Sequence, residues 1–196
     1  PYRAPESFGN PFAEVPLDSW IDEAVLEEHK KAVGPHGINE LGMYTDQIAP
    51  GYPRMPGSAQ DMAGLRRIMD GYDTGILYAD YLVGQLLDLL KEQGLYEDTA
   101  IFITSDHGEN MGELAIYSEH GTADYPTCHI PFIMKWPGCK AGSVDSGLHY
   151  SLDLLPTMAQ LLGVEPWEKW DGQSFAPAVT EGKAAGREYL VLSQMA

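Results

Sequence analysis

Basic residues are scarce in this 196-residue sequence, which has 12 Lys and Arg against 29 Asp and Glu and a formal net charge of -17. Such a surface repels phosphate backbones and anionic lipid headgroups. We therefore expect no nucleic-acid partner and no membrane partner. The acidic balance agrees with simple solubility, and also with a protein that binds metal ions or carbohydrate.

Long apolar runs and cysteines are also few. No run approaches the roughly 18 apolar residues of a membrane span, and no basic-then-apolar signal opens the sequence. Cys128 and Cys139 do not by themselves indicate a redox compartment. With 44% hydrophobic residues, the chain can bury one substantial core. We expect a single globular α/β unit over residues 1–196.

The hydrophobic pattern predicts three helices and three strands. The helices are expected at residues 18–34, 59–93 and 151–163, and the strands at 100–104, 130–136 and 189–192. In the longest helix, apolar residues recur at steps of three and four. A long helix followed by a tight turn and a continuous apolar strand favours a mainly parallel sheet flanked by helices. The segment 34–60, rich in Gly and Pro, is predicted to be a long loop or insertion.

A polar cluster follows the strand at 100–104 directly. Ligands of open α/β sheets bind outside the carboxyl ends of the strands, where this sequence places Asp106 and His107. A carboxylate and an imidazole are a common ligand pair for a divalent metal, and Gly108 lets the backbone turn away. The alternative is that Asp106 caps a helix while His107 lies in solvent.

A second histidine, His120, lies in the turn-rich stretch before the strand at 130–136. It can reach the same site as a cation or proton donor that faces an anion. The alternative is a loop histidine that bonds only to the backbone. The residues alone leave both interpretations open.

Four motifs occur in an order that resembles the sulfatase family of the alkaline-phosphatase-like superfamily. They are Thr104–Gly108, Ile130–Gly138, Asp153–Thr157 and Asp171–Ser174. The resemblance covers residues 65–180. It implies an α/β alkaline-phosphatase-like sandwich with a mainly parallel sheet, of which this chain is a C-terminal fragment, and it implies hydrolysis of sulfate esters.

The resemblance also implies roles for individual residues. Asp106 would be a metal ligand, and His107 a second ligand or a contact to the sulfate oxygens. His120 would bind the sulfate and assist the leaving group, so His107 and His120 are the catalytic candidates. Calcium is the first metal expected, with manganese, zinc or iron open because His107 is softer than an amide oxygen. Family members of this kind occupy periplasmic, extracellular or lysosomal-type compartments.

The nucleophile of that family is missing from this sequence. The resemblance implies a formylglycine made from Cys or Ser in a Cys/Ser-x-Pro/Ala-x-Arg motif, but Cys128 is followed by His129-Ile130 and Cys139 by Lys140-Ala141. The Asp-Asp pair that supplies the other metal ligands is missing as well. We expect a nucleophile outside this chain, no activity of the 196 residues alone, and weak metal binding.

Two rival functions stay open at this point. One is a phosphonate monoester or phosphodiester hydrolase of the same superfamily, and the other is a non-catalytic remnant that binds a partner or carbohydrate. If the chain is a sulfatase, its substrate is a small-molecule or carbohydrate sulfate ester chosen by the loops at 34–60 and 109–127. Trp167 and Trp170 could stack on a sugar or serve as packing anchors. The sequence does not decide the oligomeric state.

Overall fold

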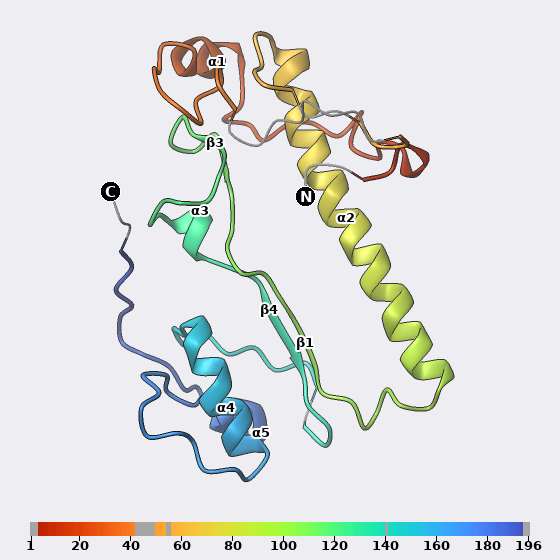
Figure 1. Cartoon of the computed structure of the whole chain (residues 1–196), viewed down its shortest axis with the longest axis vertical. Coiled ribbons are helices and arrows are strands. Elements are labelled where there is room, and N and C mark those ends of the chain that lie inside the picture. The colour runs from red at the N-terminus through yellow and green to blue at the C-terminus, as the bar shows by residue number, and fades with distance from the viewer. Residues whose placement is uncertain (1–3, 42–49, 54–55, 140, 194–196) are drawn as a thin grey trace. The chain divides into compact units, whose positions relative to one another are not determined.

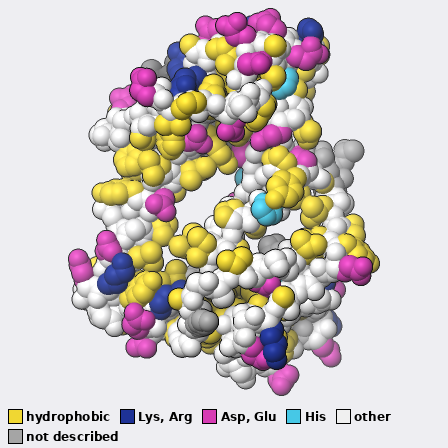
Figure 2. Space-filling model, turned by 180° about the vertical axis from the view of Figure 1, so that it is seen from behind, with side chains coloured by type: hydrophobic (Ala, Val, Ile, Leu, Met, Phe, Trp, Pro, Cys, Tyr) yellow, Lys and Arg dark blue, Asp and Glu magenta, His cyan; other side chains and the backbone are white. Residues whose placement is uncertain are grey.

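The computed structural model describes residues 4–41, 50–53, 56–139 and 141–193 (Figure 1). It divides into two compact units, and each is described by itself. The first unit comprises Pro1–Gly94 and His107–His129, and the second comprises Leu95–Asp106 and Ile130–Ala196. Acidic side chains are scattered over the face shown in Figure 2, where Lys and Arg occur at few places.

Two helices of the first unit begin at aspartate caps. The side chain of Asp22 accepts the Val25 N–H at 2.8 Å at the start of α1 (Glu23–His29), and a 3-10 turn, η1 (Glu6–Phe8), precedes it. The expected helix at 18–34 is therefore too long at both ends, because Asp22 supplies the cap and α1 ends at His29. In α2 (Met62–Glu92), Asp61 accepts the Gly64 N–H at 2.7 Å. This helix confirms the prediction at 59–93.

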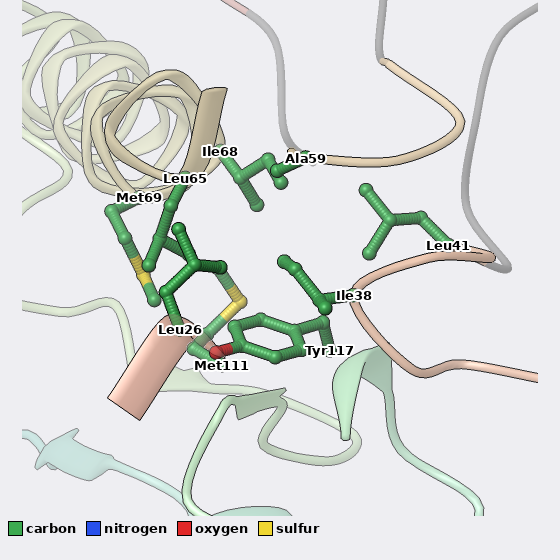
Figure 3. Close-up of a cluster of buried hydrophobic side chains, with 9 residues drawn as sticks. All are labelled: Leu26, Ile38, Leu41, Ala59, Leu65, Ile68, Met69, Met111 and Tyr117. Atoms are coloured by element: carbon green, nitrogen blue, oxygen red, sulfur yellow. The ribbon is translucent and has the colours of Figure 1, made fainter. Parts of the chain in front are cut away.

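The core of the first unit joins segments that are far apart in the sequence (Figure 3). Its buried members come from α1, α2, the segment 34–60 and the stretch after residue 107: Leu26, Ile38, Leu41, Ala59, Leu65, Ile68, Met69, Met111 and Tyr117. The described residues of 34–60 form no helix or strand, in line with the expected loop, yet this segment gives three side chains to the core. Residues 42–49 and 54–55 of that loop lie outside the described residues.

A short hairpin follows in the first unit. Strand β2 (Asn110–Met111) pairs antiparallel with β3 (Tyr117–Glu119), and the helix α3 (Tyr125–Cys128) comes next. The Tyr117 N–H donates to the carbonyl of His36 at 2.7 Å. Its hydroxyl lies 2.7 Å from Nδ1 of His29. These bonds tie the hairpin to α1 and to the loop that follows α1.

Among its described residues, the second unit contains one strand pair and two short helices. Strand β1 (Ile101–Thr104) pairs antiparallel with β4 (Phe132–Lys135), with Ile101 opposite Lys135. A 3-10 turn, η2 (Ser151–Asp153), leads into α4 (Leu154–Leu161), and α5 (Ala176–Glu181) follows. Both strands and the helix near residue 155 occur where the sequence predicts them.

One expectation about strands is not confirmed and another is wrong. Among the described residues no strands pair in parallel, since β1 and β4 run antiparallel and so do β2 and β3. A parallel pair needs a crossover, usually a helix packed on the same sheet, and residues 107–129, which join β1 to β4, belong to the first unit. The strand expected at 189–192 is wrong: in the described part of the chain these residues pair with no other strand. No described helix is long and apolar enough to cross a membrane.

Candidate functional site

The backbone at Gly108 packs directly against α3. Its N–H donates to the carbonyl of Thr127 at 2.7 Å. A Cβ added at this position would lie 1.9 Å from the carbonyl oxygen of Pro126. Glycine is therefore required here by the close approach of two backbones. This contact fixes the loop that begins at His107.

Asn110 anchors the other end of the same loop. Its side chain is fully buried, and its amide Nδ2 donates to three oxygens: Thr122 Oγ1 at 2.7 Å, Thr127 Oγ1 at 3.0 Å and Asp124 Oδ2 at 3.1 Å. Burial raises the pKa of Asp124, but hydrogen bonds from Thr122 and Asn110 outweigh it and hold this pKa below its usual value. Asp124 therefore caps α3 as a carboxylate.

His107 and His120 lie face to face between these anchors. Their ring centroids are 3.8 Å apart and their planes differ by 15°. Nδ1 of His107 lies 2.8 Å from the carbonyl of Gly108, and because a carbonyl only accepts, this nitrogen carries the proton and leaves Nε2 to other partners. The structure thus brings together the two histidines that the sequence singled out.

Glu109 is a third member of the cluster, which sequence reasoning missed. Its side chain is only 9% exposed, and its Oε2 lies 3.4 Å from Nδ1 of His120. One ligand atom from each of His107, Glu109 and His120 lies within 4.8 Å of the others. The one local signal in the sequence was its position two residues after His107, because its contact with His120 joins residues that are far apart in the chain.

The backbone of His120 is held by the preceding glutamate. The carboxylate of Glu119 accepts the N–H groups of His120 at 3.0 Å and Gly121 at 2.5 Å, and it lies 2.8 Å from Nδ1 of His36. Burial raises the pKa of Glu119, but the two backbone hydrogen bonds outweigh it and lower the pKa. A carboxylate that stays ionised therefore fixes the turn carrying His120.

The donor atoms of this cluster fit a divalent metal. Two imidazoles and a carboxylate suit manganese, iron or zinc, while calcium prefers oxygen ligands. Oε1 of Glu109 is buried and has no hydrogen-bond partner among the described residues. The lone pair of an imidazole nitrogen lies in the ring plane, so two nearly parallel rings do not converge on one ion. Only one of the two histidines can be a ligand in this arrangement.

Two other sequence motifs meet in the second unit, where they hold the fold together. Asp153 is 1% exposed, contacts Nη2 of Arg187 at 2.6 Å, and accepts the N–H groups of Tyr150 at 2.9 Å and Gln173 at 2.7 Å. Thr157 Oγ1 donates to the Asp153 carbonyl and accepts the Phe175 N–H at 3.0 Å. These contacts join the motif at 153–157 to the one at 171–174. Asp106, also in this unit, directly precedes His107 in the chain.

Comparison with known proteins gives consistent matches. The family model described as Sulfatase matches residues 27–164. A multifunctional alkaline phosphatase superfamily protein of Trinickia caryophylli is 33% identical, over 65% of this chain and 25% of its own. An N-acetylglucosamine-6-O-sulfatase of Bacteroides thetaiotaomicron is 34% identical, over 60% of this chain and 21% of its own.

A solved structure is similar as well. The phosphonate monoester hydrolase of Silicibacter pomeroyi is 31% identical with a TM-score of 0.59, over 65% of this chain and 24% of its own. The chain therefore spans about a quarter of the length of the relatives it matches.

Proposed function

The chain belongs to the sulfatase family, and on that basis we propose that it forms part of a sulfuric ester hydrolase. The reaction adds water to a sulfate ester and releases an alcohol and sulfate. The observation that carries the proposal is the stacking of His107, the residue after Asp106 in the sequence, on His120, which has the carboxylate of Glu109 beside it. For the complete domain we keep the alkaline-phosphatase-like sandwich with a mainly parallel sheet.

Asp106 and His107 are the proposed metal ligands. They are consecutive in the sequence, and because Nδ1 of His107 donates to the Gly108 carbonyl, the lone pair that can bind a metal is on Nε2. A divalent cation held there would polarise the sulfate oxygens and stabilise the charge that develops on the transferring group. Calcium agrees with the carboxylate of Asp106, and manganese, iron or zinc agrees better with the imidazole.

His120 is the proposed contact to the substrate. Its side chain is 37% exposed, while its Nδ1 atom is buried. The edge of the ring that carries Nε2 is therefore the edge available to an anion. At this position an imidazole can bind a sulfate oxygen and hold a proton at Nε2 for the departing alcohol oxygen.

The nucleophile is proposed to come from a residue that this sequence does not contain. By the family resemblance that residue is a formylglycine, and the 196 residues contain no Cys/Ser-x-Pro/Ala-x-Arg motif from which one could form. We therefore propose that the described chain supplies metal ligands and the leaving-group side of the site.

A sulfated carbohydrate is the proposed substrate class. One relative is named an N-acetylglucosamine-6-O-sulfatase. In the second unit the side chains of Trp167 and Trp170 are 57% and 36% exposed, which is unusual for packing anchors and suits stacking on a sugar ring.

A phosphonate monoester or phosphodiester hydrolase is the second candidate. It is favoured by the likeness to the Silicibacter pomeroyi enzyme and by the imidazole beside Asp106. The sequence also left open a remnant that only binds a partner or carbohydrate. In that case metal affinity would not depend on Asp106 or His107.

One assay separates these candidates. The intact protein is incubated with 4-nitrophenyl sulfate and, separately, with 4-nitrophenyl phenylphosphonate, before and after treatment with a chelator. We expect turnover of the sulfate that is lost with the chelator, restored by metal, and abolished in Asp106→Ala. Preference for the phosphonate supports the second candidate, and no turnover of either supports the binding remnant. The 196-residue chain by itself should turn over neither compound.

A further inference from the structure

We propose that Glu109 is a positioning residue that orients the ring of His120 so that Nε2 faces the substrate. This inference rests on the role proposed above for His120. Neither the motif order nor the family match points to Glu109. The proposal comes from burial and contacts within the first unit alone.

Glu109 is a largely buried carboxylate beside His120. Its side chain is 9% exposed, and its Oε2 lies 3.4 Å from Nδ1 of His120. A buried charge is costly unless it is paired. The Nδ1 atom of His120 and Oε1 of Glu109 both lack hydrogen-bond partners among the described residues. The two side chains therefore satisfy each other when they close by a few tenths of an ångström.

Three contacts together define the position of the His120 ring. Glu119 holds the backbone through the N–H groups of His120 and Gly121. The ring of His107 stacks on one face and sets its plane. Neither contact distinguishes the ring from its flipped form, because rotation by half a turn keeps both the plane and the backbone. Glu109 makes that distinction, since it attracts Nδ1–H and leaves Nε2 on the exposed edge.

The competing role for Glu109 is that of a metal ligand together with His107 and His120. The stacking of the two rings opposes it, because parallel imidazoles do not direct their lone pairs to one point. Burial, and then the charge of Glu109, raises the pKa of Tyr72 in α2. The stacked rings and the contact of Glu109 with Nδ1 of His120 favour support of His120 as the role of this carboxylate.

The test uses Glu109→Gln, His120→Ala and the double variant in the intact, metal-loaded protein. Glu113→Gln is the matched control, because Glu113 is an exposed carboxylate in the same loop that accepts the Met111 N–H. Each protein is assayed with phenyl sulfate, whose leaving group is poor, and with 4-nitrophenyl sulfate, whose leaving group is good. Metal affinity is measured by calorimetry, and folding by circular dichroism.

A positioning role predicts a loss of kcat that is larger for the ester with the poor leaving group. Glu109→Gln should lower kcat about 10- to 100-fold for phenyl sulfate and about threefold or less for 4-nitrophenyl sulfate, because only the poor leaving group needs His120. KM and metal affinity should stay within about threefold, and the double variant should match His120→Ala. Glu113→Gln should resemble the wild type.

Three results would overturn the proposal: equal losses on both esters, losses that add in the double variant, or a loss of metal affinity above about tenfold. Should Glu109→Gln not fold, Glu109→Asp is the second variant, because its shorter side chain keeps the charge but moves it away from His120. A wild-type kcat for phenyl sulfate in that variant also overturns the proposal. If the wild type hydrolyses no sulfate ester, the proposed function fails. The same pair of leaving groups on phenylphosphonate then still tests Glu109.

Discussion

The imidazole rings of His107 and His120 stack at a centroid distance of 3.8 Å and an interplanar angle of 15°. We propose different roles for these two similar side chains. Nδ1 of His107 bonds to the Gly108 carbonyl, so Nε2 is the nitrogen that we propose binds a metal. Nδ1 of His120 lies beside Glu109, so Nε2 is the nitrogen that we propose contacts the substrate.

His107→Ala and His120→Ala should therefore fail differently. We expect His107→Ala to weaken metal binding by at least about 10- to 100-fold, as loss of even a supporting contact does. His120→Ala should keep the metal and lose about 10²- to 10⁴-fold in kcat. Calorimetry and steady-state kinetics on the intact protein measure both. His129→Ala, an exposed histidine that stacks on Tyr125, is the control, and equal metal loss in both variants would contradict these roles.

Gly108→Ala should destabilise the first unit and abolish activity. Its Cβ would lie 1.9 Å from the Pro126 carbonyl oxygen, so the loop or α3 has to shift at a cost of about 1–3 kcal/mol or more. The control is Gly84→Ala in α2, where a Cβ meets nothing within 4 Å and helix propensity predicts a gain of about 0.5–1 kcal/mol. Thermal or urea unfolding measures both, and a Gly108→Ala protein as stable as Gly84→Ala would refute the close packing.

Asn110→Ala should also weaken the loop that carries the site. The variant leaves Thr122, Asp124 and Thr127 without their shared donor, which costs about 1–3 kcal/mol for buried polar groups. Asn39→Ala removes one exposed hydrogen bond, to the Lys30 carbonyl, and should change stability by about 0.5 kcal/mol or less. If chemical denaturation gave the two variants equal losses in the free energy of unfolding, the buried hydrogen bonds of Asn110 would contribute no more than the exposed one of Asn39.

The Asp153–Arg187 pair should make the second unit sensitive to acid. Burial raises the pKa of Asp153, but hydrogen bonds from Arg187 and the Gln173 backbone outweigh it, so the folded pKa lies below the usual 3.8. The contribution to stability is present above pH 3.8 and is lost as the pH falls through the folded pKa.

Arg187→Met tests that pair, because it leaves a buried carboxylate unpaired. We expect it to cost about 3 kcal/mol at neutral pH and to move the onset of acid unfolding to higher pH. Lys183→Met removes a fully exposed ion pair with Glu181 and should leave the acid profile unchanged. Unfolding followed by circular dichroism from pH 2 to 7 gives the comparison, and identical profiles for the two variants would count against the pair.

Tyr117→Phe should change the response to alkali. Burial, and then the charge of Glu113, raises the pKa of Tyr117 to about 12. The pKa of Tyr117 is higher in the folded protein than the unfolded value of 10.0. The neutral hydroxyl therefore contributes its full share to the free energy of unfolding below pH 10, and this share is lost as the pH rises through about 12. The variant should lose about 1 kcal/mol at neutral pH with the His29 hydrogen bond, yet fall less steeply above pH 10 in unfolding experiments. A slope as steep as that of the wild type would disprove the assignment.

Much of the site could be predicted from residues close in sequence. Strand β1 ends at Thr104, as its apolar pattern predicts, and Asp106 and His107 follow it at once; their role as ligands stays a prediction. The helix α2 was found because its apolar period is a local pattern. Glu109 was not found, since its neighbour His120 lies on the far side of the hairpin β2–β3.

The sequence by itself determined the family, through four motifs in order, and the presence of the long helix α2 to within three residues at each end, because both depend on short-range spacing. Only the tertiary structure decided that β1 and β4 run antiparallel, that Ile38 and Leu41 of the expected loop belong to the core, and that residues 189–192 stay unpaired in the described chain. It also decided which edge of the His120 ring lies against Glu109. Each of these depends on contacts between distant segments, whose free energy no local pattern of residues records.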